Sequence, residues 1–427
     1  MLNNHKPLMI IAVIASLTLP LTANATNGYF AHGYGTKNKA LAGGGSALPQ
    51  DAMIAATNPA GMVWVGDRMD LGAAIFSPQR EYTVTGDAFD DAGYFELTLE
   101  NVESDSNYFP IPHFARNWML DADSSAGLTV YGNGGMNTDY PGTAGGGAGT
   151  FYGGATGVDL SQLFINTTYA RKINDMSSWG ASAIIAYQRF KATGLVGFSG
   201  YSSDNSNLTD NGYDDAFGFG AKLGWQGEVR PGTTLAASYQ TKIAMGKFDK
   251  YAGLFAEQGG FDIPATWTLG LAHDIAAAGT VTFDVQTIYY NDVKSIANPL
   301  LPNLQPSTLG NNDGAGFGYE DMTIYKLGYQ WSTNPNWIWR VGYSKGDQPI
   351  PTSEVLFNIL APAVMEQHIT GGFTLNTGKT SEINFAAMYA PGNSVTGPNP
   401  LSGPTPDQNI KLEMSQWELE ASWAWKF

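Results

Sequence analysis

Trp417-Glu418-Leu419-Glu420-Ala421-Ser422-Trp423-Ala424-Trp425-Lys426-Phe427 is the stretch of sequence that decides the fold. Its odd positions carry Trp, Leu, Ala, Trp, Trp and Phe, whereas its even positions carry Glu, Glu, Ser, Ala and Lys. Successive side chains of a β-strand point to opposite faces, so this strand has one aromatic, apolar face and one polar face. Because nothing after Phe427 is left to cover the apolar face, lipid is its natural solvent. The pattern indicates the closing strand of a transmembrane β-barrel.

The same alternation recurs along the chain. Phe217, Phe219 and Trp225 share one face of their segment, and Lys222 and Gln226 share the other. Runs of about 9–16 residues suit a tilted transmembrane strand and are longer than most soluble strands. We expect an all-β fold, an antiparallel barrel of about fourteen strands. They span roughly residues 69–80, 107–118, 126–139, 160–174, 177–192, 213–228, 233–248, 262–275, 279–294, 320–332, 336–347, 365–377, 380–391 and 411–427.

The connections between these strands alternate in length. Short turns are expected at about 119–125, 175–176, 229–232, 276–278, 333–335 and 378–379, and long loops at about 81–106, 140–159, 193–212, 249–261, 295–319, 348–364 and 392–410. Short periplasmic turns and long extracellular loops are typical of membrane barrels, and an even strand count places both termini on the periplasmic side. A large soluble β-sandwich or propeller is the alternative, but it needs neither lipid-facing aromatics nor this loop asymmetry.

The first residues have the pattern of a signal peptide. Lys6 supplies a positive charge, residues 8–21 are apolar, and Ala23-Asn24-Ala25 has the small-x-small cleavage pattern. The alternative is a single membrane anchor, but the apolar run of about 14 residues is shorter than the roughly 20 that a spanning helix needs. We therefore expect residues 1–25 to be removed, a mature chain that starts at Thr26, and export to the bacterial outer membrane.

The composition narrows the function. Charged residues make up 14%, the net charge is −16 and cysteine is absent. The charge argues against a nucleic-acid partner, and the lack of cysteine excludes disulfides and thiolate metal sites. Acidic loops are either a solvated surface or a place for divalent cations near lipopolysaccharide. We expect no cofactor and no metal.

Residues 26–66 do not alternate, and we expect them to form a hatch inside the barrel of residues 67–427. Small residues dominate this segment, and glycine allows close backbone approach. The lumen of a barrel this size is too wide for side chains alone to fill. A disordered periplasmic tail is the alternative, but the segment is too apolar for it. Its larger apolar residues are Tyr29, Phe30, Tyr34, Leu41, Leu48, Met53, Ile54 and Met62.

Four motifs in this segment carry a family resemblance. They are Asn27-Gly28-Tyr29-Phe30-Ala31-His32-Gly33-Tyr34-Gly35, Ala40-Leu41-Ala42-Gly43-Gly44-Gly45, Leu48-Pro49-Gln50-Asp51-Ala52 and, above all, Asn58-Pro59-Ala60-Gly61-Met62. Together with the strand count and the terminal Phe427, they make the chain resemble the FadL/TodX family of outer-membrane transporters for hydrophobic compounds. The resemblance covers essentially the whole mature chain.

The resemblance implies a mechanism. Extracellular loops capture a hydrophobic cargo, which reaches a site beside the start of the hatch and leaves sideways into the bilayer where the third strand kinks. A hydrophobic solute loses little by entering lipid, so this exit suits it better than an aqueous channel. The resemblance also implies a monomer in outer-membrane lipid and lipopolysaccharide, and Phe427 is expected to engage the outer-membrane assembly machinery.

The implied roles fall on particular residues. Phe30 is the expected ligand contact at the hatch start. Asn58, Pro59 and Ala60 form the hatch signature, where the Asn58 side chain is expected to anchor the hatch to the barrel. The lateral gate is expected at Gly132, Gly134 and Gly135, because glycines inside a strand mark a bulge or a gap in the side-chain wall.

A fatty acid cargo would need a basic partner in the lumen. Lys294 has the matching parity, on the face of Asp284 and Asp292, where the family's lumenal lysine would fall. Arg189 and Lys191 are a second basic pair of open parity. The alternative for Lys294 is an internal salt bridge to Asp284 or Asp292. If all these bases are neutralised, the cargo is an uncharged hydrocarbon or aromatic compound.

Apolar residues in the long loops are candidates for initial capture: Leu254, Phe255, Phe261, Val355, Leu356, Phe357, Ile359 and Leu360. The function expected is passive transport of hydrophobic molecules. The alternative is a receptor, adhesin or structural barrel whose hatch never opens. A porin for polar solutes fits less well because the hatch blocks the lumen. An enzyme fits least, because His32, His113, His273 and His368 form no recognisable catalytic or metal motif.

Overall fold

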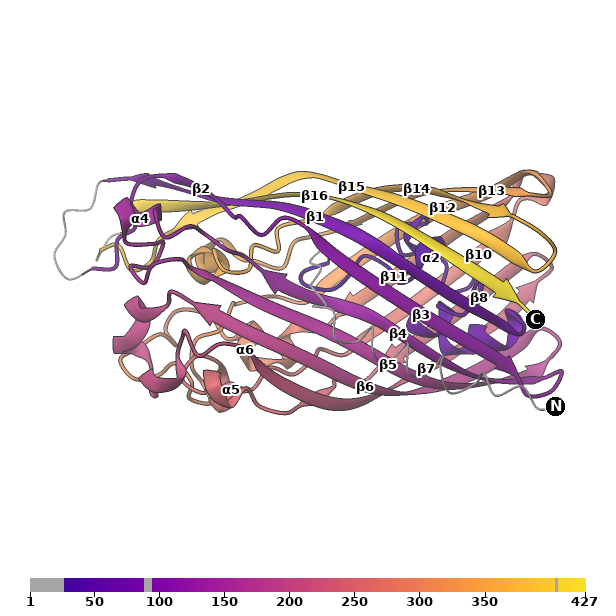
Figure 1. Ribbon diagram of the computed structural model, residues 1–427, viewed down its shortest axis with the longest axis horizontal. Helices are drawn as coiled ribbons and strands as arrows, with labels where there is room; N and C mark the ends of the chain where they lie inside the picture. Colours follow the sequence, from indigo (N-terminus) through magenta and orange to yellow (C-terminus); the bar gives the residue numbers. More distant parts are fainter. Residues whose placement is uncertain (1–26, 88–93, 404–405) are drawn as a thin grey trace, which may run out of the picture.

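The computed structural model describes residues 27–87, 94–403 and 406–427, so the expected signal peptide lies outside the described residues. The chain forms a closed, tilted antiparallel barrel (Figure 1). Its fourteen long strands are β1 (Arg68–Gly86), β3 (Phe109–Met119), β4 (Ser124–Asn137), β5 (Gly157–Asn174), β6 (Ser177–Thr193), β7 (Asp214–Arg230), β8 (Thr233–Gln240), β10 (Thr266–Asp274), β11 (Thr280–Ile288), β12 (Met322–Asn334), β13 (Trp337–Gly346), β14 (Gln367–Asn376), β15 (Ser381–Pro398) and β16 (Gln408–Lys426). β1 pairs with β16 from Arg68↔Lys426 to Gly86↔Gln408 and closes the sheet, which confirms the fold class.

The other elements are short. Two small strands, β2 (Asn101–Glu103) and β9 (Ala244–Met245), pair with β1 and β7. The helical turns are α2 (Thr36–Lys39), α3 (Ile54–Thr57), η2 (Pro59–Trp64), α4 (Ala144–Gly147), η3 (Val196–Tyr201), η4 (Asn205–Asn207), η5 (Asp249–Tyr251), α5 (Ala256–Gly259), η6 (Ala276–Ala278), η7 (Tyr290–Asp292), α6 (Lys294–Ala297), η8 (Thr352–Glu354) and α7 (Val355–Asn358). Among the described residues, no helix has the length and apolar character needed to cross a membrane.

The outer face of the barrel carries the apolar side chains that the alternation predicts. On β16, Leu419 and Trp423 are exposed, as is Phe427 directly after the strand, whereas Glu418 and Glu420 are buried inside. Other exposed large apolar residues on the strands are Leu71, Ile75, Phe217, Phe219, Leu223, Trp225, Leu269, Phe283, Tyr325, Leu327, Trp339, Val341 and Tyr343. A band of this kind is what a barrel presents to acyl chains.

Three expected strands are too long. β8 ends at Gln240, β10 begins at Thr266 and β11 ends at Ile288, so the expectations of 233–248, 262–275 and 279–294 overrun the ladder. The residues past these ends include Phe248 and Tyr290, which are fully buried. They fill the mouth of the barrel from several sides. Their apolar character therefore does not indicate a face of a strand in contact with lipid.

The segment 27–66 lies inside the barrel, as the hatch expectation required. Paired glycines on neighbouring strands make room for it. Gly180 on β6 pairs with Gly224 on β7, and a Cβ built on Gly224 would lie 2.0 Å from Oδ1 of Asn58. Gly328 and Gly342 form a second pair, and a Cβ on Gly342 would lie 2.4 Å from the carbonyl carbon of Leu41. The barrel wall is therefore hollowed where hatch backbone passes.

The hatch signature is anchored through Asn58. Its Oδ1 accepts a hydrogen bond from Ala60 N at 3.1 Å and so caps η2, in which Pro59 occupies the first turn. Its Nδ2 donates to Ser46 O in the hatch at 3.1 Å and to Trp225 O on β7 at 3.2 Å. Asn58 thus links two hatch segments to the barrel wall.

A cluster of buried ion pairs, here called the hatch latch, joins α2 to the seam of β15, β16 and β1. Its centre is Glu382, which contacts Lys37, Arg68 (2.7 Å) and Lys426 (2.8 Å). On β16, Glu418 and Glu420 each lie 2.7 Å from Lys39 Nζ, and Arg68 also pairs with Asp70 at 2.6 Å. Each charge is paired, as burial requires.

We predict that Glu382→Gln lowers the stability of the folded barrel by about 3–5 kcal/mol, because it leaves buried cations without their partner. The measurement is the temperature at which the folded form is lost on a semi-native gel. Glu413→Gln is the control, since Glu413 pairs with Lys411 at a half-exposed site. Equal midpoints for the two variants would contradict the prediction.

Candidate functional site

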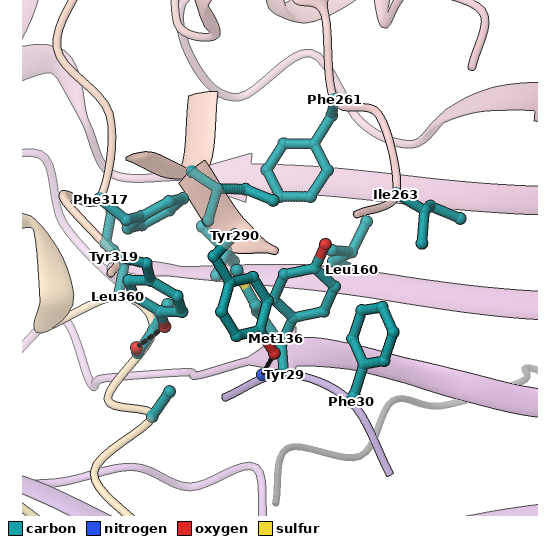
Figure 2. Close-up of a cluster of buried hydrophobic side chains, with 14 of the residues drawn as sticks. Tyr29, Phe30, Met136, Leu160, Phe261, Ile263, Tyr290, Phe317, Tyr319 and Leu360 are labelled. Carbon is teal, nitrogen blue, oxygen red and sulfur yellow. Dashed lines mark hydrogen bonds between the residues drawn. The ribbon is translucent and has the colours of Figure 1, made fainter. Parts of the chain in front are cut away.

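Five buried aromatic rings form a compact cluster inside the barrel, here called the aromatic cage: Tyr29, Phe30, Phe261, Tyr290 and Tyr319 (Figure 2). The ring centroid of Tyr29 lies 5.2 Å from Phe30, 5.3 Å from Tyr290 and 6.1 Å from Phe261. Tyr290 and Tyr319 are 5.5 Å apart. Residues from the start of the hatch thus meet residues from two extracellular loops, the one before β10 and the one between β11 and β12.

Two tyrosines of the cage, Tyr290 and Tyr319, are held by backbone groups. Tyr290 Oη donates to Asn27 O and accepts from Tyr29 N at 3.2 Å, and Tyr319 Oη donates to Ala361 O at 2.8 Å. Burial raises the pKa of Tyr290 and of Tyr319 well above the usual value of a phenol. Both side chains therefore remain neutral, and the cage presents uncharged rings.

The start of the hatch adds to β4 as a short strand. Ala31 N donates to Asn133 O at 2.9 Å and Gly135 N donates to Tyr29 O at 2.8 Å, around an antiparallel bridge between Phe30 and Gly134. A Cβ on Gly134 would lie 1.9 Å from Tyr29 O, so glycine is required at this position. Phe30 is therefore buried in the cage, where the sequence placed the internal ligand.

The pairing of β3 with β4 stops beside this bridge, and we call the stretch of wall in which the two strands are unpaired the wall gap. Their ladder ends at Phe114↔Val130. β3 remains paired with β1 as far as Phe109, and β4 remains paired with β5 as far as Asn137. The gap is bounded above by a hydrogen bond from Ser106 Oγ to Asn137 Oδ1 at 2.6 Å.

The sequence of both strands accounts for the separation. β3 contains Pro110 and Pro112, which donate no backbone hydrogen bond and are tolerated only at a sheet edge. β4 has a register shift between Gly132 and Gly134, with Asn133 as the extra residue. The glycines were recognised in the sequence, but the prolines were missed, although an x-Pro-x-Pro run inside a strand is itself a signal of an unpaired edge.

An apolar cavity lies among the extracellular loops. This loop cavity is lined by Phe190, Phe198, Leu254, Phe255, Phe357 and Leu360 and has a volume of about 30 Å³. The ring centroid of Phe255 lies 4.6 Å from that of Phe190 and 4.8 Å from that of Phe261 in the cage, and both ring pairs are tilted. Of the other capture candidates, Val355, Leu356 and Ile359 are buried in the same apolar cluster. The loop cavity therefore joins the cage through adjacent rings.

The expected basic residues lie elsewhere. Lys294 is on α6 with its side chain 44% exposed, and its Nζ lies 3.4 Å from Asp313 and 3.6 Å from Glu257. The parity argument for Lys294 is wrong because β11 ends six residues earlier, at Ile288. The alternative pairing with Asp284 is also wrong, since that carboxylate accepts from Gly45 N and Ser46 N of the hatch.

Arg189 and Lys191 point away from the lumen. On β6 the neighbouring residues Gln188 and Phe190 are buried inside, so the two bases occupy outward positions. Both lie over the ring of Tyr213, with the Arg189 guanidinium 3.7 Å and the Lys191 ammonium 5.3 Å from its centroid. Their place in a lumenal site is therefore corrected: they belong to the outer surface.

Histidines in the barrel interior contact hatch or strand groups. His113 Nδ1 lies 3.3 Å from Glu420, and His32 stacks on His368 with centroids 5.7 Å apart. Within the described part of the chain, no three His, Asp or Glu residues are arranged to hold a metal ion.

Comparison with known proteins agrees with this geometry. A family profile described as outer membrane protein transport protein (OMPP1/FadL/TodX) matches residues 17–416. No curated protein sequence was found to be similar.

Several solved structures share the fold. The toluene transporter TodX of P. putida superposes with a TM-score of 0.69 at 19% identity, covering 93% of this chain and 99% of TodX. A FadL homologue of Pseudomonas aeruginosa gives 0.69 at 15% identity, with 94% and 100% covered. The toluene transporter TbuX of Ralstonia pickettii gives 0.63 at 18% identity, with 93% and 99% covered.

The profile match over most of the chain, together with the hatch inside a closed fourteen-stranded barrel, identifies the protein. It belongs to the OMPP1/FadL/TodX family of outer membrane transport proteins and is a non-enzymatic transporter.

Proposed function

We propose that the protein moves hydrophobic molecules passively across the outer membrane, from the loop cavity through the aromatic cage and sideways through the wall gap into the bilayer. One observation carries this proposal: the apolar path from loop to cage ends beside an interruption in the barrel wall. Phe255 of the loop cavity and Phe261 of the cage connect the two sites, with 4.8 Å between their ring centroids. The hatch bridge at Gly134 then places the cage next to the gap.

The hatch supports a lateral exit over a vertical one. Asn58, the paired glycines of the wall and the hatch latch hold the hatch in the half of the lumen near the short turns through buried contacts. Opening a vertical channel would break several of these contacts at once, each involving desolvated charges or backbone groups. A sideways path leaves them in place, and an apolar solute gains by entering lipid directly.

Two solved structures with this fold, TodX and TbuX, are named as toluene transporters. The proposed cargo class for this chain is correspondingly small hydrophobic molecules, either fatty acids or hydrocarbons. A receptor or structural barrel would share the fold and the hatch but would give no uptake.

We predict that a reversible staple across the wall gap stops uptake. A Cβ on Gly132 would lie 3.2 Å from Cγ2 of Ile111 on the facing strand, so Ile111→Cys with Gly132→Cys places two thiols within reach of a disulfide. The chain has no other cysteine. Uptake of radiolabelled oleate and toluene is measured in cells without their own hydrophobic transporter. It should fall to the level of cells without the protein when the staple is oxidised and return on reduction.

The reduced form of the same variant is the control for folding. Uptake that persists through the oxidised staple would refute the lateral exit and favour passage past the hatch. No uptake by the wild-type protein, shown to be folded in the outer membrane, would favour the receptor or structural alternative.

We also predict that Phe255→Ser raises the KM for uptake by about 10- to 150-fold, because loss of the ring removes about 1.5–3 kcal/mol of apolar contact from the loop cavity. The maximal rate should change little, since the cage and wall gap are intact. Val196→Ser, at an exposed loop position, is the control and should leave KM unchanged. A lower maximal rate with an unchanged KM would place Phe255 outside the capture step.

A further inference from the structure

Two buried histidines stack on each other where the hatch meets the wall, and we call them the histidine pair. His32 lies in the hatch and His368 on β14, and each residue is 1% exposed. Their ring centroids are 5.7 Å apart and the ring planes are 15° from parallel. The first segment of the hatch is thus joined to the barrel by two titratable rings, which the proposed transport path does not use.

The hatch backbone is tightly packed at His32. A Cβ built on Gly43 would lie 1.8 Å from His32 O, so two hatch segments cross here with their backbones in contact. Neither ring nitrogen of His32 makes a hydrogen bond of normal geometry. Directly before it, Ala31 N donates to Asn133 O on β4 in the hatch bridge. A change at His32 therefore reaches the residues that complete β4.

The hydrogen-bond partners of His368 are neutral groups on neighbouring strands. Its Nδ1 lies 3.0 Å from Oγ of Ser344 on β13, and its Nε2 lies 3.4 Å from the amide nitrogen of Gln416 on β16. A hydroxyl and an amide satisfy a neutral imidazole, which has one donor and one acceptor. They do not supply the negative charge that would compensate a buried imidazolium. His368 is therefore accommodated in its uncharged form.

The charged groups that act on His32 most strongly are cations. Lys326 on β12 donates from Nζ to His32 O at 3.1 Å, and Lys39 on α2 is the second. Burial, followed by the charges of Lys39, His368 and Lys326, lowers the pKa of His32 well below the usual imidazole value. The backbone of Lys39 opposes this shift in the pKa only in part. His32 is therefore uncharged at neutral pH.

The carboxylates of this part of the interior are engaged by other groups. Glu418 and Glu420 on β16 each lie 2.7 Å from Lys39 Nζ. Asp284 on β11 accepts from two backbone N–H groups of the hatch. Among the described histidines, only His113 has a carboxylate oxygen within 4.0 Å of a ring nitrogen. A proton on the histidine pair would thus meet the two ammonium groups without a carboxylate partner.

The pH dependence follows from the difference between the closed and the loosened hatch. A histidine in water has a pKa of about 6.5, whereas His32 in the closed hatch binds a proton only at a lower pH. The closed hatch is therefore fully favoured above about pH 6.5 and loses stability as the pH falls below that value. Between pH 7 and pH 5, each histidine that is exposed on loosening multiplies the population of the loosened hatch by about 25.

We propose that the histidine pair is an acid-responsive contact of the hatch. At neutral pH the two uncharged rings stack and hold the first hatch segment against β14. In acid, a proton on either ring separates that segment from the wall, and the hatch bridge to β4 loosens with it. The hatch thus responds to the acidity of the medium. This inference does not depend on the proposed function.

The test is hydrogen–deuterium exchange of the purified full-length protein in a non-ionic detergent, followed by mass spectrometry and corrected for the intrinsic exchange rate at each pH. In the wild type, the peptides that cover residues 28–40 should exchange about 25-fold or more faster at pH 5 than at pH 7. Peptides from β5 and β6 should keep their protection at both pH values, which also shows that the barrel is folded.

Two substitutions remove the titration and keep most of the contacts. His32→Phe retains a ring that can stack on His368, and His368→Gln retains a group that can bond to Ser344. Each single variant should lose part of the acid response, and the double variant should exchange less than about threefold faster at pH 5 than at pH 7. Because the readout is a ratio within one protein, a variant whose hatch is looser at both pH values still reports it.

His113→Gln is the matched control. His113 is also a buried histidine of the interior, but its Nδ1 lies 3.3 Å from Glu420. A proton there has a carboxylate partner and does not oppose the closed state of the hatch. This variant should therefore keep the acid response of the wild type.

Exchange of the hatch start that does not depend on pH in the wild type would overturn the proposal. So would an acid response that survives in the double variant, since it would belong to protonation of the carboxylates of the hatch latch. Equal loss of the response in His113→Gln would also refute the assignment to the histidine pair. None of these outcomes bears on the transport proposal, which the uptake measurements test separately.

Discussion

The structure depends on the rule that every backbone N–H and C=O within a bilayer must be hydrogen-bonded inside the protein. Closure of β1 onto β16 satisfies this rule along most of the wall. The wall gap is the exception, because β4 loses its partner above Val130. There the start of the hatch replaces the missing strand: Ala31 N reaches Asn133 O, and Gly135 N reaches Tyr29 O.

The other side of the gap meets the same rule differently. Pro110 and Pro112 remove two N–H groups from β3, so that edge has fewer donors to satisfy. An unpaired stretch of wall is therefore compatible with the membrane because the proline edge and the hatch bridge occur together. The proposed exit and the stability of the barrel depend on the same few residues.

The sequence predicted the barrel well because lipid imposes a two-residue period on each strand. That period gave the parity of Glu418, Glu420 and Trp423 correctly. The two-residue period gave the wrong side-chain direction for Lys294, because it applies only within a paired strand and β11 ends at Ile288. The hatch was predictable from its motifs, and Asn58 binds the wall as expected.

Pairings across the chain were not predictable. The opposition of Gly180 to Gly224 depends on strand register, which a single glycine-rich sequence does not reveal.

The interior has two halves of different chemistry. Near the short turns, buried charges join hatch and wall, as at Lys39 with Glu418 and Glu420. Near the long loops, rings such as Phe190, Phe255 and Tyr290 fill most of the space. A barrel with this division holds its hatch by ion pairs away from the proposed cargo path and lines that path with weak, non-directional contacts.

The bridge between Phe30 and Gly134 has a consequence for the order in which the barrel assembles. The residues that complete β4 are the first of the described chain, yet the strand they join lies about a hundred positions later. The wall can thus be finished only after the leading end of the chain has been drawn inside it. The barrel must therefore stay open during assembly until that end is in place. A chain that closes earlier keeps an unpaired strand edge, on which a neighbouring molecule can nucleate aggregation.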